Sequence, residues 1–261
     1  MIEKSIKEIE QGKFEKVVLA RSKSIQTPED FSALAFFNAL IHEYQNAFVY
    51  LSYIPGAGMW AGATPETLIS IDSHRQFATT ALAATQQFDA SVAPGDVTWS
   101  QKDIEEQALV CRYIVDCFKK IRLREYEEIG PRTQISGNLI HLKTDYKVDI
   151  DRVGFAELGS VMLQLLHPTS AVCGQPKEMA MDFIQQYEGF DRAYYSGYLG
   201  PVNMMNETHI FVNLRCMQLI RGAAILYAGA GIIANSIPER EWNETEIKMQ
   251  TLLKVLKKMH P

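Results

Sequence analysis

The stretch LYAGAGIIANSIPEREWNETEIK, residues 226–248, joins a strand signal, a run of small residues and a helix start. Its apolar beginning is typical of a strand, which we expect to end in AGAG at 228–231, where another molecule can approach the backbone closely. Ser236 and Glu239 have the spacing of a capping box, and Pro238 suits a first helical turn. The stretch therefore predicts a strand, a bare backbone segment and then a helix.

The predicted helix carries charged groups on one face. Glu241, Glu244 and Lys248 stand at positions i, i+3 and i+7, so they share a face. Two carboxylates and an ammonium beside a bare backbone suit a metal-assisted site for an anionic ligand. A plain amphipathic helix with a solvated acidic first turn is the more common alternative. An apolar stripe indicates that the helix docks on a core: Met249, Leu252, Leu253 and Leu256.

The composition is that of a soluble globular protein. The chain has 261 residues, 47% hydrophobic and 22% charged, enough for a large core in one domain. A net charge of −5 argues against a nucleic-acid partner, and no apolar run approaches the roughly 20 residues that span a bilayer. The four cysteines lack metal-binding spacing, so we expect free thiols in a reducing cytoplasm. A monomer or weak homo-oligomer is expected.

Strand and helix patterns alternate irregularly along the chain, which favours an α+β fold over repeating βαβ units. A charged first segment at 1–16 is helical in pattern, not a signal peptide. A helix from about 102 has an apolar face that leads back to Glu106, a carboxylate at the buried edge of its first turn. Strands are expected at 16–21, 48–54, 68–71, 76–82, 209–220 and 223–228, and further helices at 153–166 and 177–187.

Seven motifs occur in a recognisable order: KVVLAR, GATPE, HPTSAVCG, E-GFDR-YYSGYLG, VNLRC, LYAGAGI and EWNETEIK. Over about residues 14–256 the chain resembles the catalytic domain of the chorismate-utilising enzymes, the anthranilate synthase component I-like family. It is most similar to the isochorismate synthases. The resemblance implies a large α+β domain, two antiparallel β-sheets flanked by helices, with a magnesium-dependent site. Family members usually carry an additional N-terminal segment, so 1–261 resembles the catalytic domain alone.

The resemblance assigns two catalytic residues. Lys16, in KVVLAR, matches the lysine that is thought to activate water in the isochorismate and salicylate synthases. An ammonium group in an apolar pocket or beside other cations loses its proton more easily, which suits a base. Glu66, in GATPE, matches the general acid that protonates the departing hydroxyl, and a desolvated carboxyl suits that role. Without the resemblance, both residues would be read as solvent-exposed.

The resemblance also implies a magnesium site. Glu106 and Glu244 match the two family carboxylates that bind Mg²⁺, and Asp103 and Glu241 would hold its waters. Mg²⁺ prefers oxygen ligands, keeps several waters and often bridges to an anionic substrate. Crowded acidic groups would repel one another without a cation between them.

The remaining matched residues would contact chorismate. Arg215 and Lys248 would bind its second carboxylate together with backbone N–H groups near Gly229 and Gly231. His167 matches an active-site histidine, although a lone histidine beside proline is often structural. Residues expected to line the pocket are Ala84, Thr85, Ala171, Val172 and Tyr195.

Three departures from the family pattern bear on turnover. Ala84 stands where the family has glycine, and an added methyl or a backbone unable to reach positive φ could narrow the site. Gln86 and Gln87 follow where the family often has arginine. Gln107 replaces a histidine next to the metal carboxylate.

An isochorismate synthase of menaquinone or siderophore synthesis is the preferred interpretation. A salicylate synthase would use the same residues and then eliminate pyruvate. An amine-transferring enzyme is disfavoured because Lys16 is present. A non-catalytic chorismate-binding protein is the alternative that Ala84, Gln107 and the expected lack of the N-terminal segment suggest.

Overall fold

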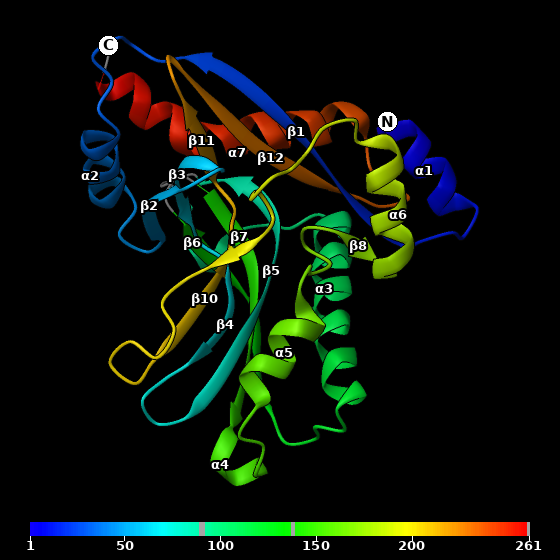
Figure 1. Cartoon of the computed structure of the whole chain (residues 1–261). Coiled ribbons are helices and arrows are strands. Elements are labelled where there is room, and N and C mark those ends of the chain that lie inside the picture. The colour runs from blue at the N-terminus through cyan, green and yellow to red at the C-terminus, as the bar shows by residue number, and fades with distance from the viewer. Residues whose placement is uncertain (89–91, 137–138, 260–261) are drawn as a thin grey trace.

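The computed structural model of the chain describes residues 1–88, 92–136 and 139–259. Within these residues two six-stranded antiparallel sheets form the framework, in the orders β2-β3-β11-β12-β1-β8 and β6-β7-β5-β4-β10-β9. The first sheet lies in the upper part of Figure 1, and the second extends below it. The predicted α+β class, two antiparallel sheets flanked by helices, is confirmed.

The strands of the first sheet are β1 (Lys16–Gln26), β2 (Phe48–Ile54), β3 (Gly58–Thr64), β8 (Gly174–Gln175), β11 (Cys216–Ile220) and β12 (Ala223–Ile232). Those of the second are β4 (Thr67–Ile71), β5 (Gln76–Gln87), β6 (Glu127–Ser136), β7 (Leu139–Asp149), β9 (Tyr198–Leu199) and β10 (Thr208–Val212). The helices are α1 (Ile2–Glu10), α2 (Ala33–Glu43), α3 (Gln101–Lys120), α4 (Ile150–Val153), α5 (Leu158–Leu166), α6 (Lys177–Tyr187) and α7 (Pro238–Met259), with a short 3₁₀ turn η1 (Pro94–Asp96).

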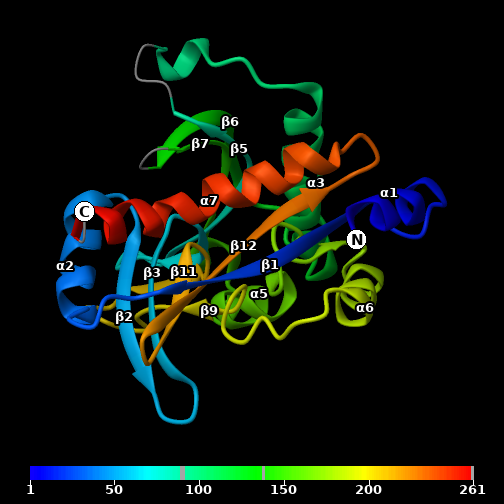
Figure 2. The same ribbon diagram turned by 90° about the horizontal axis from the view of Figure 1, so that it is seen from above.

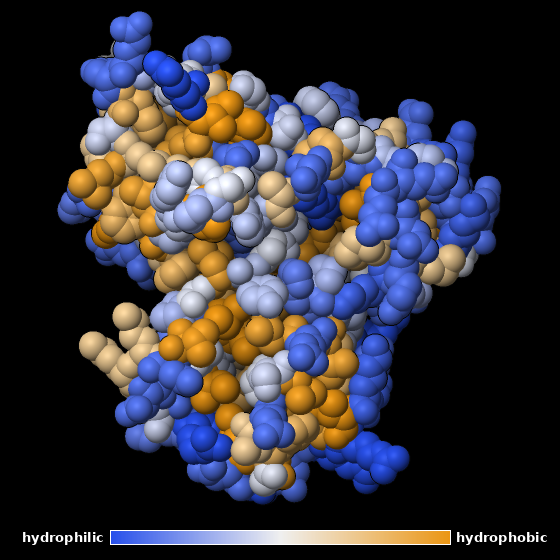
Figure 3. All heavy atoms as spheres, viewed as in Figure 1, coloured by the Kyte–Doolittle hydropathy of each residue, from blue (hydrophilic) through white to orange (hydrophobic). Residues whose placement is uncertain are grey.

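Each sheet has its own helical cover and its own core. Helices α2 and α7 pack on the first sheet, while α3 and α5 pack on the second (Figures 1 and 2). The first core includes Phe36, Leu226 and Leu252, as the apolar stripe of α7 predicts. The second core includes Phe118 and Tyr146. Figure 3 shows apolar side chains reaching this face mainly over the lower layer, among polar ones.

The predicted strand at 209–220 is wrong as a single element. It is two strands in different sheets: β10 pairs with β4 in the second, and β11 pairs with β3 and β12 in the first. Between them Arg215 adopts a left-handed backbone, with φ 48°, and the Asn213 amide holds the crossing by donating to the Tyr194 carbonyl at 2.7 Å. A continuous apolar pattern cannot show a change of sheet, because both halves alternate with the same period.

Two other boundaries and one helix cap differ from the predictions. The helix predicted at 153–166 is broken, because Gly154 in the left-handed region ends α4 before α5 begins. Strand β12 does not end in AGAG but continues to Ile232, which pairs with Val17. Helix α7 begins at Pro238 as predicted. Ser236 does not form the predicted capping box; its Oγ accepts from the Ile233 N–H at 3.1 Å and closes the preceding turn.

No helix in the described ranges has the length and apolar character that crossing a membrane requires.

Candidate active site

A polar cavity lies where the two sheets meet. Its walls come from β1 and β12 of the first sheet, β5 and β7 of the second, and the N-terminal halves of α3 and α7. Most of the predicted site residues line it, although the motifs that carry them are far apart in sequence: Glu66, Ala84, Thr85, Glu106, Ala171, Tyr195, Arg215, Gly229, Gly231, Glu244 and Lys248.

Lys16 lies directly behind this lining, at the start of β1. Its side chain is 0% exposed, and its Nζ is 2.9 Å from Glu106 Oε1. Within the described residues Nζ has no acceptor with hydrogen-bond geometry, so the contact is an ion pair with spare donors. Gly231 makes the approach possible, because a Cβ there would lie 2.3 Å from Glu106 Oε1 and 2.9 Å from Lys16 Cε.

The acidic residues of α3 and α7 meet around another lysine, Lys102. Its Nζ lies 3.0 Å from Glu241 Oε2, and 3.8 Å from one carboxylate oxygen each of Glu106 and Glu244. Burial acts to lower the pKa of Lys102, but the carboxylates outweigh it and raise that pKa. Burial likewise acts to raise the pKa of Glu106, and Lys16 with the other ammonium groups holds it below its ordinary value.

The edge of β12 opens toward the cavity. Lys248 Nζ donates to the Gly229 carbonyl at 2.8 Å and pairs with Glu244 Oε1 at 2.6 Å. The N–H and C=O of one strand residue point to the same side, so Gly229 turns both groups away from β1. Ala20, the β1 residue opposite Gly229, is consistent with this orientation, because its N–H donates to Glu188 and not to β12. Gly231 lies two residues further along β12, so its N–H also points away from β1, toward the cavity.

Glu66 faces this cationic group from the short link between β3 of the first sheet and β4 of the second. It follows β3 and is only 5% exposed. Burial raises the pKa of Glu66 to about 7, against the opposing pull of Arg215, Lys16 and Lys248. At neutral pH a substantial fraction of this carboxyl is therefore protonated and able to donate.

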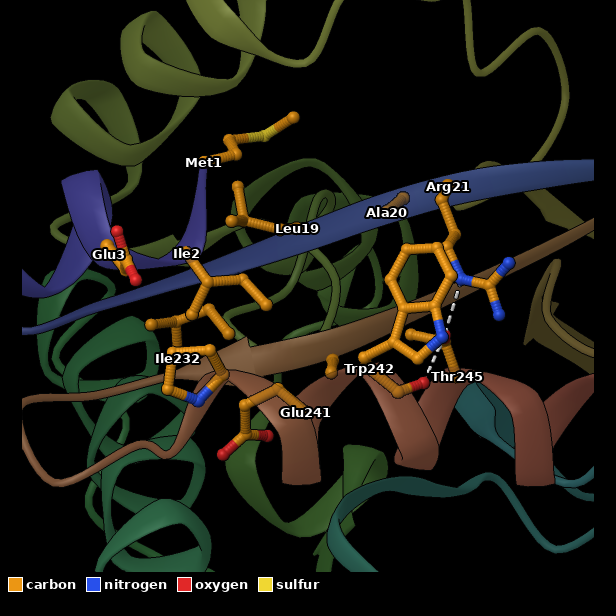
Figure 4. A pocket seen from close by; sticks show the side chains of 12 residues that line it. Met1, Ile2, Glu3, Leu19, Ala20, Arg21, Ile232, Glu241, Trp242 and Thr245 are labelled. Atoms are coloured by element: carbon orange, nitrogen blue, oxygen red, sulfur yellow. Dashed lines mark hydrogen bonds between the residues drawn. The ribbon is translucent and has the colours of Figure 1, made fainter.

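A second, apolar pocket of about 380 Å³ lies on the opposite face of β12, where Ala230 and Ile232 contribute to its lining (Figure 4). Arg21 lies 3.9 Å above the Trp242 ring and donates to Thr245 Oγ1 at 2.6 Å. The Glu241 carboxylate points away from that pair toward Lys102. The polar groups of this apolar pocket are paired with one another. We therefore place the chemistry in the polar cavity between the two sheets.

Comparisons with known proteins show the family of the chain. The family model described as "Chorismate binding enzyme" matches residues 1–257. The chain belongs to the chorismate-binding enzyme family. Isochorismate synthase 2 of Arabidopsis thaliana is 33% identical over an alignment of 251 residues that covers 92% of this chain and 43% of that protein. The chain thus spans less than half the length of that relative.

Two solved structures share the family fold. DhbC from Bacillus anthracis matches with a TM-score of 0.86 and 27% identity, over 98% of this chain and 70% of that one. MenF, the menaquinone-specific isochorismate synthase of Escherichia coli, matches with a TM-score of 0.82 and 27% identity, over 98% of this chain and 59% of that one.

Three residues expected at the site of this chorismate-binding domain lie elsewhere. His167 caps α5, its Nε2 is 3.1 Å from the Ser196 carbonyl, and it does not line the cavity. The Val172 side chain packs in the core of the second sheet. The Asp103 carboxylate closes the capping box of α3 with Ser100. Each is turned away by a local bond or by core packing that motif matching does not reveal.

Two residues that sequence reasoning missed are at the site. His141 of β7 lines the cavity; its Nδ1 is 2.9 Å from the Ala84 carbonyl, and burial lowers its pKa to about 3, so the ring is neutral. The other is Lys102. The sequence held one signal for each: a histidine inside the apolar run LIHL, and a lysine four residues before Glu106.

Of the departures from the family pattern, Ala84 lines the cavity and the three glutamines do not. Ala84 reaches φ 56°, contrary to the expectation that alanine would resist it, within an irregularity of the β5–β7 ladder. Gln107 turns away from the cavity, and its Nε2 donates to Thr144 Oγ1 at 3.0 Å. Gln86 donates to Asp103 at 3.3 Å.

The motif E-GFDR supports β1 rather than the chemistry. Arg192 pairs with Glu188 and donates to the carbonyls of Val18 and Val172, which ties the segment before α6 to the strand that carries Lys16. The pair is buried, so breaking it would leave an uncompensated charge.

Proposed function

We propose that this chain is an isochorismate synthase, which converts chorismate to isochorismate with Mg²⁺ as cofactor. The observation that carries the proposal is that one cavity has the buried Lys16 behind its lining, beside Glu106, and the partly protonated Glu66 in its lining. A base and an acid at one cavity suit a reaction that adds water at one carbon and releases water from another.

The proposed step balances in atoms and protons. A water oxygen bonds to C2 of chorismate and its proton passes toward Lys16, while the ring double bonds shift and the C4–O bond breaks. Glu66 protonates the departing hydroxyl, so one water enters and one leaves. Lys16 can act only when its amine is free of its proton and of its contact with Glu106 at 2.9 Å.

The residues fit a magnesium ion held by two carboxylates. Glu106 and Glu244 both reach the cavity, and Glu106 Oε2 is a buried acceptor without a hydrogen-bond partner in the described residues. Two carboxylates are enough for Mg²⁺, because it keeps several waters; no group of three or more candidate ligands occurs in the described residues. Glu241, which contacts Lys102 at 3.0 Å, would hold one of those waters. The bound ion would neutralise the ring carboxylate of chorismate.

The cationic residues beside the two carboxylates suit the second carboxylate of the substrate. Arg215 and Lys248 supply positive charge in the cavity, and the open N–H groups of Gly229 and Gly231 would supply directed donors. Tyr195, Ala171 and Thr85 complete the walls. One cavity therefore combines carboxylates that would hold the ion with cations that would bind a substrate carboxylate.

Product analysis tests the proposal. The protein is incubated with chorismate and Mg²⁺ and the products are separated by chromatography, beside Lys16→Ala and the control Lys23→Ala, a partly exposed lysine of the same strand that pairs with Glu246. Isochorismate should form, with a loss of roughly 10²- to 10⁴-fold in Lys16→Ala alone. Equal rates in both variants would show that Lys16 is not the base.

Other outcomes point to the remaining alternatives. Salicylate with pyruvate would indicate a salicylate synthase, and ammonia-dependent anthranilate an amine-transferring enzyme. Mg²⁺-dependent binding of chorismate without turnover would indicate a non-catalytic binding protein.

A further inference from the structure

Lys102 stands in the position that a metal ion between the acidic helices would need. Its Nζ is 3.0 Å from Glu241 Oε2 and 3.8 Å from Glu244 Oε2. It is also 3.8 Å from Glu106 Oε2, the buried oxygen without a hydrogen-bond partner in the described residues. These oxygens come from two different helices, α3 and α7, and converge on one ammonium group.

We propose that Lys102 is a built-in cation that holds the metal carboxylates together in the metal-free protein and swings out when Mg²⁺ binds. The inference rests on the magnesium site of the proposed function. Its physical basis is charge. Without a cation the three carboxylates would repel one another in a poorly solvated space, and a single ammonium group at their centre relieves that repulsion.

Mg²⁺ and the Lys102 ammonium compete for the same oxygens. Mg²⁺ binds oxygen at about 2.0–2.1 Å in near-octahedral geometry. An ammonium group that stayed within 4 Å of those oxygens would lie close to the dication and be repelled by it. Binding of the metal therefore favours a conformation in which Lys102 has left.

Of the three lysines in this cluster, Lys102 is the one that is free to move. Its side chain is 21% exposed, whereas Lys16 is fully buried. Lys248 is held by the Gly229 carbonyl as well as by Glu244. In the described residues the polar contacts of the Lys102 ammonium are all to carboxylates. Its flexible stem, in the first turn of α3, gives the ammonium group a path to water.

Calorimetric titration with MgCl₂ tests the inference on Lys102→Met, which keeps the stem and removes the charge. We expect Mg²⁺ to bind this variant roughly tenfold more tightly or better, because no ammonium has to be displaced. In EDTA the variant should melt below the wild type and recover on addition of Mg²⁺. The matched control is Lys119→Met, an exposed lysine of the same helix, which should bind Mg²⁺ as the wild type does. Unchanged or weaker binding by Lys102→Met would overturn the inference.

Glu244→Gln separates this inference from the proposed function. If Glu244→Gln binds Mg²⁺ as tightly as the wild type, the proposed metal site itself is wrong. If it loses binding while Lys102→Met gains none, only the role of Lys102 is overturned.

A measurement on the wild type covers the case in which Lys102→Met does not fold. Amine acetylation followed by mass spectrometry should label Lys102 faster with saturating Mg²⁺, while labelling of Lys119 stays constant. Equal labelling of Lys102 with and without Mg²⁺ would contradict the swing.

Discussion

Burial in the folded protein changes the protonation state of Glu66 in the direction that an acid catalyst needs. Its pKa rises from 4.5 to about 7 on burial, so the folded protein binds more protons than the unfolded chain between these values. Stability should therefore fall as pH rises from about 4.5 to 7 and stay low above that range.

We expect the wild type to lose about 3 kcal/mol relative to Glu66→Gln between pH 4 and pH 8. Urea unfolding at a series of pH values measures this difference. Parallel stability curves for the two proteins would contradict the raised pKa. In the wild type, kcat/KM for chorismate should also decline above pH 7, because the general acid is then ionised.

Ala84 carries backbone strain at the site. A non-glycine residue at φ 56° costs on the order of 1 kcal/mol. Ala84→Gly should remove that cost and stabilise the protein by about 0.5 kcal/mol, after the larger entropy of the unfolded glycine chain is subtracted. Ala83→Gly, the neighbouring position without positive φ, should destabilise by about 1 kcal/mol. Denaturant titration compares the two, and an equal loss in both would show that Ala84 is not strained.

At the scale of elements, β12 brings three groups together: the ammonium of Lys16, the carboxylate of Glu106 and the backbone edge at Gly229. A methyl at Gly231 would lie 2.3 Å from Glu106 Oε1, so Gly231→Ala must push the ion pair apart. We expect turnover of chorismate to fall at least about 10²-fold while the fold persists, because small misplacements of catalytic groups have effects of this size.

Ala230→Gly is the control for this substitution, because Ala230 lines the pocket on the other face of the same strand. Circular dichroism with a chromatographic assay distinguishes a local effect from unfolding. Full activity in Gly231→Ala would show that the contact of Lys16 with Glu106 is not needed.

The crossing from β10 to β11 is the other element on which the site depends. It places Arg215 at the cavity while its carbonyl accepts from the Ala63 N–H at 3.0 Å. Motif matching identified Arg215, but the predicted single strand would have put it on one sheet with its neighbours. Only the pairing of β10 with β4 and of β11 with β3 shows why this side chain stands between the sheets.

At the scale of the whole molecule, the cavity joins two sheets that have separate cores. A ligand that contacts both walls should stabilise the folded state as a whole. At concentrations of Mg²⁺ and chorismate about 100 times the dissociation constant, the gain is about 2.7 kcal/mol, which corresponds to a rise in Tm of roughly 5–10 °C.

Differential scanning fluorimetry measures this shift. Arg215→Ala should lose most of it, because one carboxylate then lacks its partner. Arg124→Ala, an exposed arginine far from the cavity lining, should keep it. Equal shifts in both variants would place the ligand elsewhere.

The residues 226–248 by themselves determined much of this protein. Apolar periodicity predicted β12 and α7, and the charged face of α7 predicted that Glu244 and Lys248 stand together, because residues four apart on a helix are neighbours whatever surrounds them. The ordered motifs determined the family for the same reason, since each is a short local pattern.

Only the tertiary structure decided which distant groups meet. It brought Lys102 among the acidic residues of α7, placed His141 rather than His167 at the cavity, and carried β12 past AGAG by pairing it with β1. These outcomes depend on strand register and on packing between elements far apart in the chain. A local pattern cannot specify them, because the same periodicity is compatible with several pairings.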